Sequence, residues 1–272
     1  MARTARALTI ASSDSGGGAG IQADLRAFAA AGCHGASVIV ALTAQNTQEV
    51  TAIHAVPTGF IIAQLDAVFD DIGVDAMKTG MLLSAEIIEA VAEAIAGRRV
   101  PLVVDPVMVA SSGARLLRED AVRVMVRALF PLATVVTPNL PEAEMITGAT
   151  GTRRELAERL CAMGAAAAIV TGGHGDDPVD HLFDGTHHVE IPVVRHAVST
   201  THGAGCTHSA TIAALLAQGW PLEQAGRAAA QVAARAVASG LEDIGAGDGP
   251  VDVLEVRSRA HAPPARCDAR IA

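Results

Sequence analysis

Near its start the chain reads Ala7-Leu-Thr-Ile-Ala-Ser-Ser-Asp-Ser-Gly-Gly-Gly18, an apolar run that ends in a glycine-rich loop. Residues 21–31 follow with the spacing of an amphipathic helix. An apolar run, a tight loop and a helix, in that order, form the first half of a β-α unit. This stretch therefore predicts a buried strand whose carboxyl end opens into a loop.

The same alternation continues for most of the chain. We expect further strands at residues 38–42, 76–79, 102–105, 134–137 and 166–171, and helices at 57–69, 84–96, 118–130, from about 139, and at 152–163, 205–218 and 222–239. Asp184-Gly185 lies between the apolar runs 179–183 and 187–191, which predicts a β-hairpin. The alternation predicts an α/β fold, a three-layer α/β/α sandwich with a mostly parallel central sheet and helices on both faces.

The domain organisation is simple. The sequence contains no internal repeat and no linker rich in proline or serine, so we expect a single domain over residues 1–256. Residues 257–272 contain Pro263-Pro264 and little periodicity, which predicts a loose C-terminal tail. Half of the residues are hydrophobic but only 2% are aromatic. We therefore expect a core of small aliphatic side chains on closely packed helices.

Charge and composition exclude several classes of protein. The formal net charge is -9, with 20 basic and 29 acidic residues, so the electrostatic footprint of a nucleic-acid or anionic-membrane partner is missing. The four cysteines form no Cys-x-x-Cys pair, which indicates neither a zinc knuckle nor a disulfide framework. The start has no apolar export signal, and no run of about 18 apolar residues occurs later. We expect a cytoplasmic protein that acts on small molecules.

The glycine cluster at residues 16–20 fits neither common nucleotide-binding motif. A Walker A loop would need a Gly-Lys pair after the glycines, and a dinucleotide fingerprint would need glycine where Ile21 stands. Two interpretations stay open. The glycines form a tight turn that permits close packing, or they form a small-molecule site at the carboxyl end of the strand.

A second candidate site is Thr201-His-Gly-Ala-Gly-Cys-Thr207, directly before an apolar helix. The backbone N–H groups of Gly203, Ala204 and Gly205 can converge on an anion, and the helix dipole adds positive charge. The same field would favour the thiolate of Cys206, which could then act as a base or nucleophile near neutral pH. The alternative is that Cys206 is a small hydrophobic residue of the core.

Two carboxylates are candidates for a metal site. Asn139 and Glu142 have the spacing of a capping box, which alone explains both residues. Glu142 can also lie at the strand ends beside Asp105 and help hold a hydrated Mg²⁺ near phosphates. The ten histidines show no ligand spacing of the His-Glu-x-x-His kind, so a zinc hydrolase is set aside.

Together these segments resemble the successive motifs of hydroxymethylpyrimidine and phosphomethylpyrimidine kinases. The matching stretches are Ala11–Asp24, Ala41–Asn46, Met77–Met81, Val104–Met108, Val136–Glu142 and Thr201–Cys206, within about residues 7–240. The resemblance implies a ribokinase-like fold without a separate lid. It also implies two successive phosphorylations, with ATP and Mg²⁺, of 4-amino-5-hydroxymethyl-2-methylpyrimidine and of its monophosphate in thiamine biosynthesis. It leaves a homodimer open.

The resemblance also implies roles for individual residues. Cys206 is the expected general base, with the backbone at Gly203 and Gly205 as part of the catalytic anion hole. The remaining expected contacts are Gln45, Asp24, Met81 and Val107 for the pyrimidine, Asn139, Thr171, Gly203, Ala204 and Gly205 for ATP and its phosphates, and Asp105 and Glu142 for the metal. Gln45 suits an aminopyrimidine because an amide both donates and accepts hydrogen bonds.

Four positions depart from the pattern of the family. Ser111 and Thr171 stand where relatives often have lysine, Ser12 replaces a common glycine, and His208 replaces a common leucine. Two other functions are therefore weighed against the first. One is a pyridoxal or pyridoxine kinase of the same superfamily. The other is a non-catalytic pyrimidine-binding protein that retains the fold, although mere binding would not need a base such as Cys206 beside an anion hole.

Overall fold

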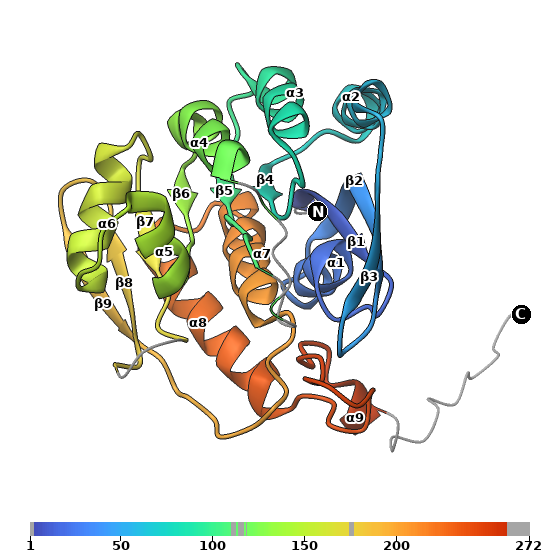
Figure 1. The fold of residues 1–272 in the computed structure, drawn as a ribbon, viewed down its shortest axis with the longest axis vertical. Coiled ribbons are helices and arrows are strands. Elements are labelled where there is room, and N and C mark those ends of the chain that lie inside the picture. Colours follow the sequence, from blue (N-terminus) through green and yellow to red (C-terminus); the bar gives the residue numbers. More distant parts are fainter. Residues whose placement is uncertain (1–2, 110–112, 114–116, 118, 174–176, 260–272) are drawn as a thin grey trace, which may run out of the picture.

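The strands of the described residues form one nine-stranded sheet in the order β3-β2-β1-β4-β5-β6-β7-β8-β9 (Figure 1). This computed structural model describes residues 3–109, 113, 117, 119–173 and 177–259. The strands are β1 (Arg6–Asp14), β2 (His34–Gln45), β3 (Val50–Ala55), β4 (Ala76–Thr79), β5 (Leu102–Val104), β6 (Val135–Val136), β7 (Ala168–Val170), β8 (Val179–Phe183) and β9 (His188–Pro192). The neighbours from β2 to β7 are parallel, whereas β3, β8 and β9 pair in antiparallel fashion.

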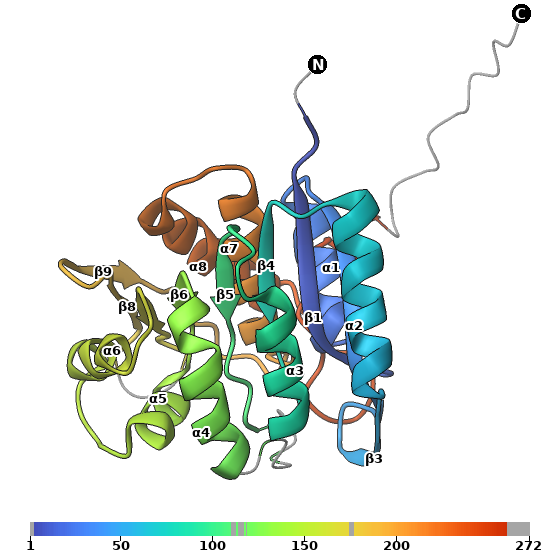
Figure 2. The ribbon, with the colours of Figure 1, turned by 90° about the horizontal axis from the view of Figure 1, so that it is seen from above.

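Helices cover both faces of the sheet, as Figure 2 shows. One layer contains α1 (Gly20–Ala30), α7 (Ala204–Ala217) and α8 (Leu222–Ala238), and the other contains α2 (Thr58–Ala67), α3 (Ala85–Ile95), α4 (Glu119–Ala128), α5 (Leu140–Thr147) and α6 (Arg153–Ala162). Three short elements complete the described chain: the π-helical turn Val68–Ile72, the 3₁₀ turn Phe130–Leu132 and α9 (Val256–Arg259). The predicted three-layer α/β/α sandwich is therefore confirmed.

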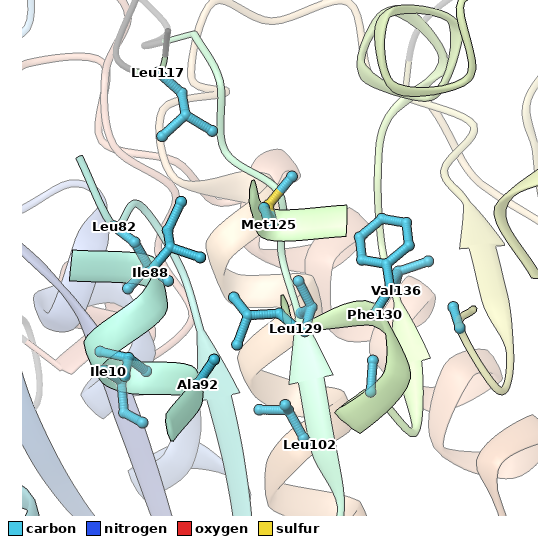
Figure 3. Packing of buried hydrophobic residues seen from close by; sticks show 14 of the residues in the cluster. Ile10, Leu82, Ile88, Ala92, Leu102, Leu117, Met125, Leu129, Phe130 and Val136 are labelled. Atoms are coloured by element: carbon cyan, nitrogen blue, oxygen red, sulfur yellow. The ribbon is translucent and has the colours of Figure 1, made fainter. Parts of the chain in front are cut away.

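Each face of the sheet has its own apolar core. On the α2–α6 side, Ile88 of α3 and Leu129, directly after α4, pack with strand residues such as Ile10 and Leu102 (Figure 3). On the other side the apolar core residues from α7 and α8 are mainly alanines. Small side chains let helices approach a sheet closely, so few aromatic rings are needed to fill the core.

Several local predictions are confirmed by hydrogen bonds. The Ser84 side chain accepts from the N–H of Ile87 at 3.3 Å and caps α3. Capping boxes at Asn139 and Thr152 begin α5 and α6. The hairpin between β8 and β9 turns at Asp184-Gly185, where Gly185 has a φ of 87°, a left-handed conformation that glycine adopts without strain.

Two boundaries differ from prediction. No pattern predicted β3, an edge strand whose residues are almost all exposed. The predicted start of the loose tail, at residue 257, is too early because residues 257–259 belong to α9. The N–H groups of Val256 and Arg257 donate to the carboxylate of Asp252. Residues 260–272 lie outside the described chain. Within the described chain, no helix combines the length and apolar character needed to cross a bilayer.

The order of the strands decides where a ligand can bind. β1 lies between β2 and β4, so the chain winds to one side of β1 first and to the other side afterwards. Open α/β sheets bind ligands beyond the carboxyl ends of the strands at such a switch point. β1 ends at Asp14, and several of the predicted site residues lie at the carboxyl ends of the strands around it.

Candidate active site

Asp14 organises the glycine-rich loop that follows β1. Its carboxylate accepts hydrogen bonds from the N–H groups of Gly16 at 2.8 Å, Gly18 at 3.0 Å and Ala19 at 2.9 Å. His202 adds a contact from its Nε2 to Asp14 Oδ2 at 3.0 Å. Burial would raise the pKa of Asp14, but the hydrogen bonds from His202 and the backbone outweigh it and lower that pKa.

This loop packs against the segment before α7 with no space to spare. A Cβ atom at Gly18 would overlap the His202 ring, and one at Gly203 would overlap the carbonyl oxygen of Gly18. Gly203 also has a φ of 85°, which favours glycine. Close packing therefore explains Gly18 and Gly203, one glycine of each motif, and it brings the two predicted sites into one.

The start of α7 is the predicted anion hole. Gly203 is the N-cap of α7 and forms no side-chain capping bond, and the first N–H groups of a helix have no acceptor within the helix. The N–H of Ala204 instead donates to Thr201 O at 3.1 Å, so of the three predicted phosphate-binding positions this one is already engaged. Gly205 is exposed at the helix start.

Cys206 is partly exposed as a residue, yet its thiol lies in surroundings that disfavour charge. Burial of the sulfur raises the pKa of Cys206 to about 12, although the positive charge of Lys78 opposes the increase and Asp24 and Asp105 add to it. The expectation that the helix dipole yields a thiolate near neutral pH is therefore wrong for the unliganded protein. Desolvation and two carboxylates outweigh the dipole.

Asp24 and Lys78 form a buried ion pair that sequence reasoning missed. Lys78 Nζ lies 2.8 Å from Asp24 Oδ1 and 3.0 Å from Oδ2, and Thr9 Oγ1 donates to the same carboxylate at 2.6 Å. Both ionic side chains are 0% exposed. Asp24 thus has no surface to offer to a ligand, which differs from the expectation that it contacts the pyrimidine. Its position on α1 directs it to Lys78 of β4 instead.

Asp105 connects this pair to α7. Its Oδ2 lies 3.5 Å from Lys78 Nζ and accepts a hydrogen bond from Ser209 Oγ at 2.8 Å. Burial would lower the pKa of Lys78, but the charges of Asp24 and Asp105 outweigh it and keep that pKa above its usual value. Ser209 is three residues after Cys206 and therefore lies on the same side of the helix.

Glu142 is held at the start of α5 near Asp105. Its side chain accepts from the N–H of Asn139 at 2.9 Å, and the Asn139 side chain accepts from the N–H of Glu142 at 2.9 Å. Burial and the negative charge of Asp105 raise the pKa of Glu142 to about 8. Two carboxylates that disfavour each other's charge in this way fit a cation between them.

The donor set defines what kind of cation fits. Among the described residues, no group of three or more His, Cys, Asp or Glu side chains is arranged to hold a metal ion directly. A fully protein-coordinated zinc or calcium is thus not supported there. Mg²⁺ needs less from the protein, since it commonly keeps several waters and takes one or two carboxylates plus substrate phosphates. Asp105 and Glu142 fit that pattern.

Thr171 follows the carboxyl end of β7 and lies next to the start of α5. Its N–H donates to Pro138 O at 2.9 Å, so Asn139 and Thr171 are adjacent. Two arginines not predicted from sequence bind this loop: Arg153 Nε donates to Thr171 O at 3.3 Å and Arg195 Nε to Gly172 O at 3.0 Å. Ser111 lies outside the described residues.

His208 lies on the buried side of α7. Its Nε2 is 3.2 Å from Asp180 Oδ2, and Asp180 Oδ1 accepts from the N–H of Gly172. The position that departs from the family pattern is therefore occupied by a buried polar pair that faces the Thr171 loop, and not by a metal ligand.

The predicted pyrimidine contacts other than Asp24 lie at or just beyond the carboxyl ends of three strands, two of which flank β1. Gln45 ends β2, Met81 follows β4 and Val107 follows β5. Ser15 Oγ bonds to both the N–H and the carbonyl of Gln45 at 2.8 Å. Thr43 Oγ1 donates to Gln45 Oε1 at 3.1 Å. This hydrogen bond fixes the orientation of the amide, so its NH₂ group points away from Thr43.

Solved structures of kinases share this architecture. The chain superposes on the ADP complex of Bacillus subtilis pyridoxal kinase with a TM-score of 0.85 at 36% identity, over 94% of this chain and 99% of that one. For phosphomethylpyrimidine kinase from Clostridium difficile the TM-score is 0.75 at 39% identity, over 84% and 97%. The fold and the rim of strand ends are those of a ribokinase-like small-molecule kinase.

Sequence comparison gives the family. The phosphomethylpyrimidine kinase model matches residues 14–252. The chain is 50% identical to a hydroxymethylpyrimidine/phosphomethylpyrimidine kinase of Rhizobium meliloti, over 91% of this chain and 96% of that one. It is also 50% identical to a thiamine biosynthesis bifunctional protein of Geobacter sulfurreducens, over 93% of this chain but only 54% of that protein, so it spans about half of that relative. The chain belongs to the phosphomethylpyrimidine kinase family.

Proposed function

We propose that the chain phosphorylates 4-amino-5-hydroxymethyl-2-methylpyrimidine and then its monophosphate, with ATP as the phosphoryl donor, in thiamine biosynthesis. The main support is the match of the whole kinase fold to hydroxymethylpyrimidine/phosphomethylpyrimidine kinases, at 50% identity in the Rhizobium meliloti relative. The ADP complex of the Bacillus subtilis pyridoxal kinase supports ATP as the donor.

In the first reaction the hydroxymethyl oxygen forms a bond to the γ-phosphorus, and the bond from that phosphorus to the β-phosphate oxygen breaks, which releases ADP. This step uses the thiolate form of Cys206: the hydroxyl proton passes to the ionised sulfur as the oxygen attacks. Because a loose transition state carries its charge on the phosphoryl oxygens, positioning and charge stabilisation provide most of the acceleration. The N–H groups at the start of α7 can stabilise those oxygens.

The remaining side chains divide between substrate, nucleotide and metal. The amide of Gln45 binds the aminopyrimidine edge, and Met81 and Val107 contact the ring. Asn139 and Thr171 bind the nucleotide on the opposite side of the rim. Asp105 and Glu142 would hold a hydrated Mg²⁺, which supplies positive charge to the phosphates when it is bound.

Pyridoxal is the second candidate substrate. The TM-score of 0.85 to the Bacillus subtilis pyridoxal kinase favours it, and pyridoxal also presents a hydroxymethyl group on a nitrogen-containing ring. The sequence relatives favour the pyrimidine.

The deciding experiment measures ADP release with MgATP and, separately, the hydroxymethylpyrimidine, its monophosphate, pyridoxal and ribose. We expect turnover with both pyrimidine compounds, and mass spectrometry should detect the diphosphate. Turnover with pyridoxal but with neither pyrimidine would contradict the proposal. A Cys161→Ala variant, altered at a half-buried cysteine of α6 that contacts β8, serves as the activity control.

A further inference from the structure

Lys78 is a fully buried cation with no assigned role in the chemistry above. Its side chain is 0% exposed, in the middle of the sheet on β4, and its Nζ contacts both oxygens of Asp24. Burial of an ammonium group costs several kcal/mol unless a well-placed counterion offsets it. Asp24 is that counterion, and Thr9 fixes the carboxylate from the other side.

The ion pair lies beneath the catalytic end of α7. Lys78 Nζ is 3.5 Å from Asp105 Oδ2, and the same oxygen accepts from Ser209 Oγ. Ser209 Oγ also lies 3.0 Å from the carbonyl oxygen of Gly205 and 3.2 Å from that of Cys206, which are alternative acceptors for its single hydroxyl proton. A continuous set of contacts therefore runs from Asp24 through Lys78, Asp105 and Ser209 to the residue proposed as the base.

A structural ion pair alone would not account for this placement. Well-packed apolar residues of similar volume often replace a buried ion pair without loss of stability, so the charges themselves need an explanation. The Cys206 sulfur must carry negative charge before it can accept the substrate proton, and Asp24 and Asp105 both disfavour that charge. Lys78 is the neighbouring cation that opposes them.

We propose that Lys78 is a positioning residue of this kinase: held by Asp24, it fixes the Asp105 carboxylate and stabilises negative charge on the Cys206 sulfur. This inference rests on the proposed function in one respect: the proposed function gives the charge on Cys206 a catalytic use. The electrostatic effect on the sulfur can be measured without turnover.

The test is the rate at which iodoacetamide alkylates Cys206 in the unliganded protein at one mildly alkaline pH, followed by mass spectrometry of the Cys206 peptide. Well below the thiol pKa, this rate is proportional to the thiolate fraction, and one unit of pKa changes it about tenfold. Three proteins are compared: wild type, Asp24→Asn, and Asp24→Asn with Lys78→Met. Alkylation of Cys161 in the same samples is the internal reference for general loosening of the fold.

Removal of Lys78 should reverse the rate change that Asp24→Asn makes. Asp24→Asn removes a negative charge and keeps the cation, so Cys206 should react faster. The double variant also removes the cation, so Cys206 should react at least about tenfold more slowly than in Asp24→Asn. Loosened packing would accelerate both variants. Equal rates in the two variants, or a faster rate in the double variant than in Asp24→Asn, would overturn the proposal.

If the double variant fails to fold by circular dichroism, Asp24→Asn alone decides, and a rate at or below that of wild type overturns the proposal. Turnover is measured on the same proteins. Compared with Asp24→Asn, the double variant should have a kcat about tenfold lower or more, since one pKa unit of lost thiolate stabilisation corresponds to a tenfold effect. The Kd of the pyrimidine should stay within about twofold. Should Cys206 prove not to be the base, kcat would not follow the alkylation rate, whereas the alkylation contrast would still decide the role of Lys78.

Discussion

His202 Nε2 lies 3.0 Å from Asp14 Oδ2, although the two residues are 188 positions apart in the chain. The contact is buried and joins the glycine-rich loop after β1 to the segment that begins α7. Asp14 fixes the first loop through three backbone N–H groups, and His202 directly precedes Gly203. One carboxylate therefore positions both backbone segments that we assign to the site.

Asp14→Asn should destabilise the protein at neutral pH by about 1–3 kcal/mol, the cost of a buried hydrogen bond left unsatisfied. The pKa of Asp14 is lowered below its usual 3.8 in the folded state. A lowered pKa contributes stability above the unfolded-state value, and this contribution is lost as the pH falls through the folded-state value. The difference between wild type and variant should therefore shrink in acid.

Chemical denaturation at neutral pH and at about pH 3, below the usual carboxyl pKa, measures both effects. An equal difference at the two pH values would show that the carboxylate charge has no role. The exposed Asp248→Asn variant is the matched control.

Gln45→Ala tests the pyrimidine contact. The variant keeps the backbone bonds to Ser15 and loses the amide, so the KM for the pyrimidine should rise about 5- to 150-fold, which corresponds to 1–3 kcal/mol for an unmade buried hydrogen bond. The KM for ATP should change little. Gln48→Ala, in the exposed turn after β2, is the control for substitutions in this region. An equal increase for both substrates would indicate a general defect.

Much of the fold was predictable because it depends on local pattern. The strand 76–79, the helices that begin near residues 84, 139 and 152, and the capping box at Asn139 follow from short-range hydrogen bonding and apolar spacing, and all appear as expected. β3 was missed because its side chains are nearly all exposed, so no apolar pattern marks it. Its backbone is recruited by pairing with β2.

The site was less predictable because its energetics depend on distant residues. Asp24 and Lys78 are 54 positions apart, and nothing near either residue in the sequence reveals the pairing. The motif therefore indicated a ligand contact at Asp24 where the structure has an inaccessible ion pair. For Cys206 the local dipole argument gave the wrong direction of the pKa change, since burial arises only when α7 packs on the sheet.

Glu142→Gln should change how stability depends on pH in the absence of Mg²⁺. The folded-state pKa of about 8 exceeds the usual value of 4.5. A carboxyl with a raised pKa binds its proton more tightly when folded, so its contribution is fully present below about 4.5 and is lost as the pH rises through about 8. Wild type should lose stability over that window, and Glu142→Gln should lose less because an amide does not ionise.

The measurement is the free energy of unfolding from chemical denaturation at several pH values across this window. Gln can still accept the N–H of Asn139, so the capping box is retained. Glu144→Gln, on the same helix, is the matched control. If Glu142→Gln and wild type show the same slope, the buried Glu142 is already ionised and the proximity to Asp105 is not costly.

Cys206→Ala separates the two phosphorylations. In the first, a neutral hydroxyl must lose its proton, and a positioned base typically contributes about 10²–10⁴ in rate. In the second, the attacking group is a phosphate oxygen, which is mostly ionised at neutral pH because the second pKa of a phosphate monoester is about 6. No base is needed there. The variant should therefore lower kcat for the hydroxymethylpyrimidine within that range and affect the monophosphate much less.

Single-turnover assays with each substrate measure the two effects, and Cys161→Ala controls for loss of a thiol elsewhere. Cys206→Asp should restore part of the first reaction, because a carboxylate at the same helix start can accept the same proton. Residual activity of the Ala variant is expected, since positioning and charge stabilisation provide most of the acceleration of phosphoryl transfer. If kcat for the alcohol is near normal, Cys206 is not the base, and the backbone N–H groups at the start of α7 remain as the catalytic device of this segment. If kcat falls equally for the two reactions, Cys206 acts on the phosphoryl group that the two steps share and not on the hydroxyl proton.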